Sequence, residues 1–250
     1  MVLPADLRTA EGQALEAVRS ALAARSAGRW TVELRFEGLR LLPVALRLLA
    51  ALNKTESRAH LVFPDAGAAA LARRDSPEQA GWLSSLGDRK RLLEREAQPA
   101  LGEVSAEEAA AFPDPADPGV LVLVEPAQAD YTDVEQICQG HRGAVVLLNS
   151  RLEDAAIGIG SVARERRRGF LSTWEAAYAL IPRDASALRR AFPEPWELYR
   201  QDPDGYRLAS QFETKPDTET LEQALALEGQ GVNVGAGLGA LDRFIEGLRN

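Results

Sequence analysis

The sequence has 250 residues, of which 46% are apolar and 26% charged, and its formal net charge is -8. These values are ordinary for a globular protein and exclude a chain that is disordered throughout. The negative charge argues against nucleic acid as a partner, because binding to phosphates needs a basic surface. No apolar run reaches the roughly 20 residues of a spanning helix. We therefore expect a cytoplasmic protein with at most a peripheral membrane contact.

The residues that most often carry chemistry are scarce. Cys138 is the only cysteine, and His60 and His141 are the only histidines. A single cysteine allows no internal disulfide, fits a reducing compartment and excludes cysteine-rich metal sites. Two separated histidines are too few for a histidine metal cluster. Neither a G-x-S-x-G, a G-x-G-x-x-G nor a Walker A motif occurs. We expect no metal, no cofactor and no catalytic residue, so an enzyme is the less favoured reading.

The first two-thirds of the chain alternates between strand and helix patterns. Residues 30–36 alternate apolar and polar, which predicts a half-buried strand near a sheet edge. Unbroken apolar runs predict buried strands at 59–63, 120–124 and 144–148. Helical spacing predicts helices at 5–27, 39–52, 66–74, 131–140 and 161–168. This alternation is typical of a three-layer α/β fold with a mostly parallel sheet and helices on both faces.

The rest of the chain differs in character. In a polar stretch over 75–118 we expect a charged helix around 88–96 and a short helix at 105–111. Short strands are expected at 176–181, 187–192, 196–199 and 206–212, with a hairpin turn at 202–205. They predict an antiparallel C-terminal extension of the sheet, followed by a helix at 218–227. We expect a single domain over 1–228, then a Gly-rich linker and a short amphipathic tail helix over 229–250.

Polar residues directly follow three of the predicted parallel strands. Asp65 follows the strand at 59–63, Glu125 follows 120–124, and Asn149 and Arg151 follow 144–148. Ligands of open parallel sheets bind at the carboxyl ends of the strands. These side chains are suited to a small polar ligand or a hydrated Mg²⁺. Alternatively, Asp65 and Asn149 only cap the helices or turns that follow them.

A second candidate for ligand binding precedes the basic helix. Gly158, Gly160 and Ser161 stand where that helix begins, and Arg164 follows in its first turn. Free backbone N–H groups at a helix N-terminus attract anions. The alternative is a glycine hinge, with Ser161 as N-cap and a solvated basic face.

The C-terminal third offers a different kind of surface. Trp196 and Tyr199 are candidates for contacting a protein partner, because Trp and Tyr are favoured in interfaces. Leu241, Phe244 and Ile245 of the amphipathic tail helix are further candidates, because the mixed charges and few basic groups of that helix favour a protein contact over an anionic lipid one. The alternative for the aromatic residues is the core of the antiparallel strands.

Several segments resemble a known family. Residues 62–73 read Val-Phe-Pro-Asp-Ala-Gly-Ala-Ala-Ala-Leu-Ala-Arg, which is similar to the FPDxGxAALA segment of the DUF1995 family. Residues 32–34, 147–154 and 192–199 resemble further segments of that family. Ser150 departs from the family's pattern, in which proline is expected. The resemblance extends over about residues 3–248.

The resemblance implies a photosynthetic setting, because the family occurs in cyanobacteria and plastids and includes a plant factor of photosystem II accumulation. It implies no catalytic residues. We therefore expect a non-catalytic assembly or interaction factor of the photosynthetic apparatus, with a protein of that machinery as partner and a peripheral thylakoid contact. The alternative is an enzyme or sensor that binds a small phosphorylated or anionic ligand at the strand ends. Partner identity and oligomeric state stay open.

Overall fold

The chain forms two compact units. The computed structural model describes residues 3–55, 58–97, 119–152 and 161–229. The first unit comprises residues 1–21, 32–40 and 176–250, and the second comprises 22–31 and 41–175. We call them the antiparallel unit and the parallel unit after their strands. The single domain expected over 1–228 stays a prediction, and the predicted tail helix lies outside the described residues.

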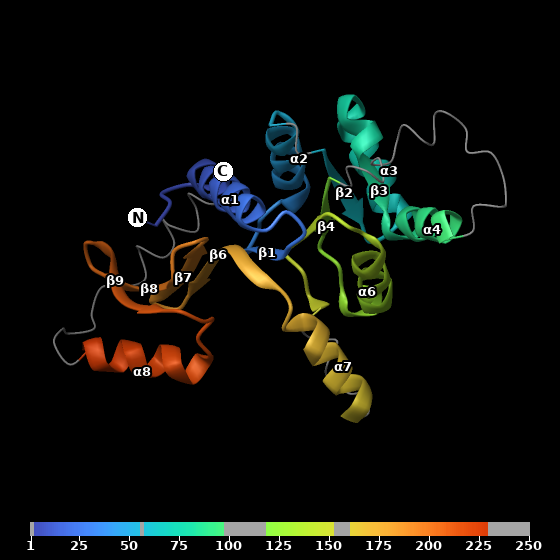
Figure 1. Ribbon diagram of the computed structural model, residues 1–250. Coiled ribbons are helices and arrows are strands. Elements are labelled where there is room, and N and C mark those ends of the chain that lie inside the picture. Colours follow the sequence, from blue (N-terminus) through green and yellow to red (C-terminus); the bar gives the residue numbers. More distant parts are fainter. Residues whose placement is uncertain (1–2, 56–57, 98–118, 153–160, 230–250) are drawn as a thin grey trace. The chain divides into compact units, whose positions relative to one another are not determined.

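The parallel unit contains four strands that all run in the same direction. They are β2 (Ala59–Phe63), β3 (Leu83–Ser85), β4 (Val120–Val124) and β5 (Ala144–Leu148). Their order is β3-β2-β4-β5, and Figure 1 labels the first three of these strands. In the register, Leu61 lies opposite Val122, and Val122 lies opposite Val146. Every residue of β2, β4 and β5 is buried, as unbroken apolar runs predict for strands covered on both faces. These strands match the predicted bounds.

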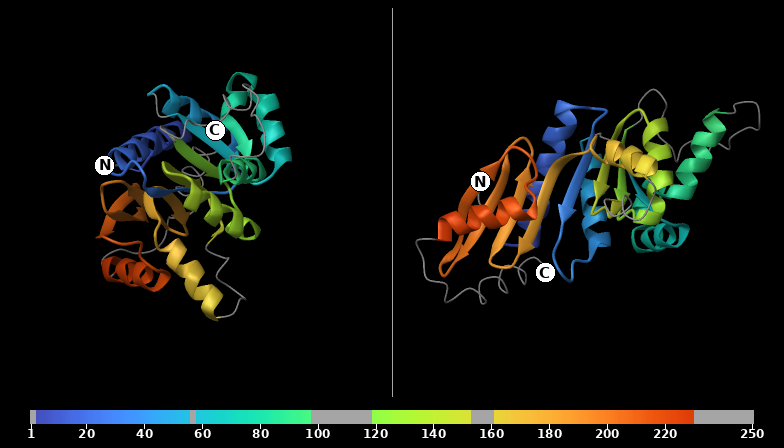
Figure 2. Two further views of the ribbon diagram at one scale, coloured as in Figure 1. Left: turned by 45° about the vertical axis from the view of Figure 1, so that its right-hand side comes forward. Right: turned by 90° about the horizontal axis from the view of Figure 1, so that it is seen from below.

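Helices cover both faces of this parallel sheet (Figure 2). They are α2 (Leu41–Asn53), α3 (Ala66–Asp75), α4 (Leu86–Ala97), α6 (Tyr131–Gly140) and α7 (Ser161–Leu171), with short 3₁₀ helices η1 (Pro77–Trp82) and η2 (Gln128–Asp130). Val62, Leu121 and Val145 share one face, because side chains alternate along a strand. They pack with α4, α6 and α7 in one apolar cluster. The five α-helices and the parallel sheet were predicted, whereas the two 3₁₀ helices were not.

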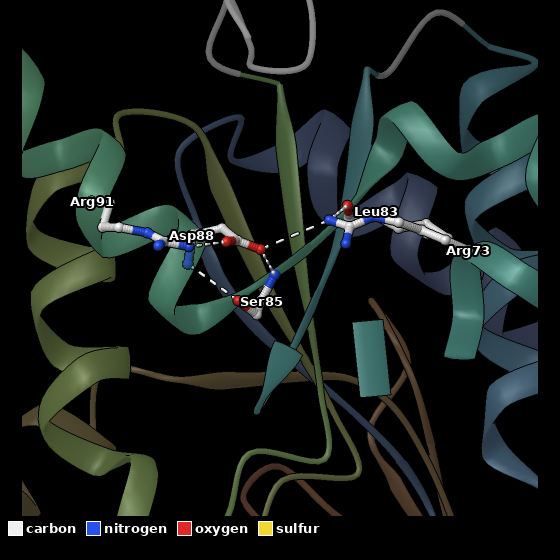
Figure 3. A network of polar contacts seen from close by, with 5 residues as sticks. All are labelled: Arg73, Leu83, Ser85, Asp88 and Arg91. Atoms are coloured by element: carbon white, nitrogen blue, oxygen red, sulfur yellow. Dashed lines mark hydrogen bonds and ion pairs between the residues drawn. The ribbon is translucent and has the colours of Figure 1, made fainter. Parts of the chain in front are cut away.

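Strand β3 and the 3₁₀ helix η1 lie within the stretch that was predicted as polar with a charged helix. Ser85 at the end of β3 caps α4: the Asp88 N–H donates to Ser85 Oγ at 3.2 Å, and the Ser85 N–H donates to Asp88 Oδ2 at 2.9 Å (Figure 3). This reciprocal pair is a capping box. Arg73 of α3 donates to the Leu83 carbonyl at 2.7 Å, and Arg91 to Asp88 Oδ1 at 2.5 Å. Polar contacts therefore hold this short strand between α3 and α4.

The antiparallel unit is built on four consecutive strands. They are β6 (Glu175–Arg183), β7 (Ser186–Ala191), β8 (Trp196–Asp202) and β9 (Gly205–Phe212), and each pairs with the next in antiparallel register. The predicted hairpin turn joins β8 to β9. Helix α8 (Thr218–Gly229) packs on one face, where Leu221 meets Leu188 and Trp196. Helix α1 (Leu7–Ala24) reaches the other face, where its Gln13 meets Tyr178 and Arg189. The predicted antiparallel C-terminal strands are confirmed.

Strand β1 (Arg29–Leu34) begins in the parallel unit and ends in the antiparallel unit. Next to its start, the Val145 N–H of β5 donates to the Gly28 carbonyl at 3.0 Å. Just beyond its end, the Arg35 N–H donates to the Leu180 carbonyl of β6 at 3.0 Å. The expectation of a strand near a sheet edge was therefore wrong. The side chains of a strand alternate between the two faces of the sheet, and Glu33 of β1 accepts a hydrogen bond from the Lys215 ammonium at 3.0 Å, so its polar character does not require an edge position.

A buried ionic network lies on the α1 face of the antiparallel unit. Arg189 is fully buried and Glu197 is 4% exposed. The Arg189 guanidinium donates from Nη1 to Glu197 Oε2 at 2.5 Å and from Nε to Gln13 Oε1 at 3.2 Å. The hydroxyl of Tyr199 donates to the same Glu197 oxygen at 3.0 Å, and that of Tyr178 donates to Gln13 Oε1 at 3.3 Å. The network thus joins α1, β6, β7 and β8.

None of the described helices combines the length and the apolar character needed to cross a membrane.

Candidate functional site at the carboxyl edge of the parallel strands

The polar residues that follow the parallel strands lie at one edge of the sheet, as predicted. Backbone hydrogen bonds continue between the two segments that follow β4 and β5. The Glu125 N–H donates to the Leu148 carbonyl at 2.8 Å, and the Arg151 N–H donates to the Pro126 carbonyl at 2.9 Å. Because Glu125 and Arg151 are tied through their backbones, both charged side chains project from a fixed base at the end of the sheet.

A pocket of about 400 Å³ opens at this edge. Asp65, Glu125 and Arg151 contribute its charged groups. Its apolar walls come from the ends of β2 and β4 and from helices α2 and α3, namely Leu42, Phe63, Pro64, Ala68, Leu71, Val124 and Ala127. Asn149 follows β5 and is 7% exposed, but it does not line the pocket. The structure therefore brings together three of the four residues predicted for this site.

Asp65 has a structural role as well as a place in the pocket wall. Its Oδ1 accepts a hydrogen bond from the Ala68 N–H at 2.9 Å, so it caps the N-terminus of α3. This capping contact was the alternative considered for Asp65. The side chain is nevertheless exposed, and its carboxylate faces the same pocket as Glu125.

Two residues at the strand ends have a left-handed backbone. Glu125 has φ 47° and Asn149 has φ 52°. Asn adopts this conformation readily, whereas for Glu it costs about 1 kcal/mol or more. Non-glycine residues in such conformations persist only where the surrounding structure holds them, and they concentrate at functional sites. The strained residue Glu125 is also the one that places a carboxylate in the pocket.

The second predicted ligand site lies partly outside the described residues. Gly158 and Gly160 lie outside the described residues, and Ser161 is the first residue of α7. Arg164 is exposed on that helix. Further along α7, Arg166 donates to Glu135 of α6 at 2.8 Å, and the Arg167 guanidinium lies 4.7 Å from the centre of the Tyr131 ring. Part of the basic face of α7 is therefore engaged with α6.

The aromatic residues proposed for a partner surface belong to the core. Trp196 and Tyr199 are each 4% exposed. Trp196 packs in the cluster beneath α8, and Tyr199 joins the buried ionic network on the opposite face. They offer no exposed surface in this fold, which is the alternative considered for them. Leu241, Phe244 and Ile245 lie outside the described residues.

The histidines and the cysteine contribute nothing to the pocket. Burial lowers the pKa of His60 to about 4, and the neighbouring Arg89 and His141 act in the same direction. Burial, followed by Arg89, likewise lowers the pKa of His141 to about 4. Burial raises the pKa of Cys138 to about 12, so its thiol is not a nucleophile at neutral pH. Among the described residues, no group of three His, Cys, Asp or Glu side chains is placed to hold a metal.

Sequence reasoning missed the apolar walls of the pocket. Leu42 lies near the start of α2, and Leu71 lies on α3 with 46% of its surface exposed. Both lie in segments that were predicted as helices, at 39–52 and 66–74, with no binding role assigned to them. An apolar residue on the flank of a helix carries no local signal that distinguishes core from pocket wall. The exposure of Leu71 becomes visible only once α3 is placed against the strands.

Comparison with known proteins identifies the family of the chain. No curated protein and no solved structure matches it. The family described as a domain of unknown function (DUF1995) matches residues 4–223, which include the parallel unit, the whole pocket and much of the antiparallel unit. The chain therefore belongs to the DUF1995 family.

Proposed function

We propose that the parallel unit binds a small organic ligand in the pocket at the carboxyl edge of β2, β4 and β5. The observation that carries this proposal is the position of the charged groups: Asp65, Glu125 and Arg151 all line one pocket of about 400 Å³. That volume falls within the range of about 300–1,000 Å³ found for small-molecule sites. Open parallel sheets bind their ligands at this edge.

The lining of the pocket supports binding of an organic molecule. Small-molecule sites are mostly apolar, with a few polar groups that fix the ligand's orientation. Here Phe63, Leu42 and Val124 supply apolar wall, and three charged side chains supply orientation. The left-handed backbone of Glu125 adds support, because strained conformations of this kind concentrate at functional sites and Glu125 contributes a carboxylate to the pocket.

Filling the pocket with a larger side chain tests this proposal. Ala68 lines the pocket on α3, whereas Ala70 on the same helix is exposed and does not line it. We expect compounds that raise the melting temperature of the wild-type chain to do so equally in Ala70→Phe and not in Ala68→Phe. A ligand at 100 times its Kd stabilises by about 2.7 kcal/mol, a shift of roughly 5 to 10 °C.

The panel for this measurement contains amino acids, amines, carboxylic acids, sugars, sugar phosphates and nucleotides. Shifts that survive in Ala68→Phe would place the ligand elsewhere. The absence of any shift across the whole panel in the wild-type chain would count against a small-molecule site. Both variants are first checked for an unchanged circular dichroism spectrum.

An accessory role through a protein partner is a second candidate, in line with the expectation of an assembly factor of the photosynthetic apparatus. One observation favours it. Strand β9 pairs with β8 alone among the described strands, and its Leu208 is 47% exposed. An unpaired strand edge with an apolar side chain is a site for pairing with another chain.

Capture from a cyanobacterial extract tests this second candidate. We expect tagged wild-type chain to recover photosystem subunits, and Leu208→Lys to recover roughly tenfold less, because the charge disrupts an apolar contact worth about 1.4 kcal/mol. Gln211→Lys on the same strand is the matched control, since Gln211 is also exposed. Equal recovery by Leu208→Lys and Gln211→Lys would contradict a contact through β9.

A further inference from the structure

We infer that the ligand of the strand-end pocket is a zwitterion with an apolar body, the chemical class of an α-amino acid with a large apolar side chain. This inference rests on the proposed function, because it concerns the same pocket. It goes further by assigning a ligand charge to each charged residue: a carboxylate to Arg151 and an ammonium group to Glu125, with Asp65 as a second negative neighbour.

The first argument is that the opposite charges of the pocket are not satisfied by each other. Within the described residues, the Arg151 guanidinium and the Glu125 carboxylate make neither an ion pair nor a side-chain hydrogen bond, although both line the same pocket. Their backbones are tied by the hydrogen bonds to Pro126 and Leu148. Two fixed opposite charges that do not neutralise one another present separate positions for a ligand that carries both signs.

The second argument concerns the balance of charge. Asp65 and Glu125 give the pocket two carboxylates against the single guanidinium of Arg151. A phosphorylated ligand brings a charge of about -1.5 to -2, and both carboxylates would repel it. A zwitterion brings one negative group for Arg151 and one positive group for the carboxylates. The expectation of a phosphorylated ligand at this edge is therefore replaced by a ligand with a single negative group.

The third argument concerns the walls. Leu42, Phe63 and Val124 contribute apolar wall, and Leu71, which is exposed, also lines the pocket. Removing apolar surface from water stabilises binding by about 25 cal/mol for each Å². A ligand that carries only charged groups leaves these apolar walls exposed to water, whereas a large apolar side chain covers them. The apolar walls therefore favour amino acids such as phenylalanine and leucine over glycine or aspartate.

A matched set of compounds separates the two charge assignments. The compounds are L-phenylalanine, 2-phenylethylamine, which lacks the carboxylate, and 3-phenylpropionate, which lacks the ammonium group. Binding to the full chain is measured by calorimetry and by the shift in melting temperature. In the wild-type chain we expect each truncated compound to bind roughly tenfold or more weakly than phenylalanine, because each leaves one pocket charge without its partner.

Two variants each remove one of the pocket charges to which a charged group of the ligand is assigned. In Arg151→Gln, phenylalanine should fall to the affinity of 2-phenylethylamine, whose own affinity stays unchanged. In Glu125→Gln, phenylalanine should fall to the affinity of 3-phenylpropionate. Both side chains are exposed, so the variants are expected to keep the fold. Arg142→Gln, which changes an exposed arginine that does not line the pocket, should behave as wild type.

The outcomes distinguish this inference from the proposed function. Equal binding of 2-phenylethylamine and phenylalanine would overturn the zwitterion, as would tighter, Arg151-dependent binding of a sugar phosphate or nucleotide. In both cases sensitivity to Ala68→Phe would leave the pocket as a ligand site. If no compound of the broader panel binds, the proposed function fails together with the inference.

Discussion

Replacing Glu197 by Gln is expected to lower the free energy of unfolding of the antiparallel unit by about 3 to 5 kcal/mol. The reason is that Arg189 is fully buried and has its shortest contact, 2.5 Å, with the Glu197 carboxylate. Without that negative charge, the guanidinium stays in the core and loses the carboxylate that its Nη1 contacts. A buried charge without its counter-charge is among the most destabilising changes that a core can receive.

A double replacement tests this explanation. Arg189→Met combined with Glu197→Gln removes both charges of this pair, and we expect it to recover much of the lost stability, because neither member then leaves a charge in the core without the other. Glu213→Gln is the matched control: Glu213 is exposed in the same unit, and its change should stay within about 0.5 kcal/mol. Urea unfolding followed by circular dichroism, with hydrogen exchange of the β7 and β8 amides, provides the measurement. A double variant as unstable as Glu197→Gln alone would contradict the electrostatic explanation.

Acid is expected to destabilise the parallel unit through His60. The folded chain holds the pKa of His60 at about 4, because the ring is buried and lies near Arg89 and His141, whereas the ordinary value is 6.5. As pH falls from 6.5 to 4, His60 therefore binds a proton in the unfolded chain but not in the folded chain. Stability falls by about 1.4 kcal/mol for each pH unit in this window, or about 3 kcal/mol in total.

The variant His60→Leu isolates this contribution. His60 is 3% exposed in β2, so an apolar residue is compatible with its surroundings, and it cannot titrate. Unfolding free energies at pH 7, 6, 5 and 4 should fall less steeply in the variant, with the gap to wild type approaching about 3 kcal/mol at pH 4. His141→Leu serves as a comparison, because burial also lowers the pKa of His141 to about 4. Identical pH profiles of wild type and His60→Leu would contradict the prediction.

Local sequence patterns predicted the parallel strands well because burial on both faces leaves a direct signature. The apolar runs of β2, β4 and β5 have no other stable placement than the centre of a covered sheet. Strand β3 escaped prediction because its three residues, Leu83–Ser85, include two serines and are held by side chains from α3 and α4. Strand β1 was misplaced at an edge because its polar Glu33 is paired with Lys215, which lies 182 positions away in the sequence.

The candidate site could be predicted in part for a similar reason. Asp65, Glu125 and Arg151 follow strands whose direction was correctly predicted, so their meeting at one edge follows from the topology. The walls from α2 and α3 depend on how those helices pack. The network around Arg189 was also missed, because its partner Gln13 lies 176 positions away in the sequence. No local pattern marks such a pair.

The division of the antiparallel unit among three chain segments has a consequence for protein synthesis. Helix α1 leaves the ribosome first, yet Arg189, which its Gln13 contacts, follows 176 residues later. At about 5 to 20 residues per second, that interval lasts roughly 10 to 35 s. The parallel unit, by contrast, is complete at residue 175. The nascent chain therefore completes the parallel unit first, whereas Gln13 of α1 meets Tyr178 and Arg189 only after these late strands have been synthesised.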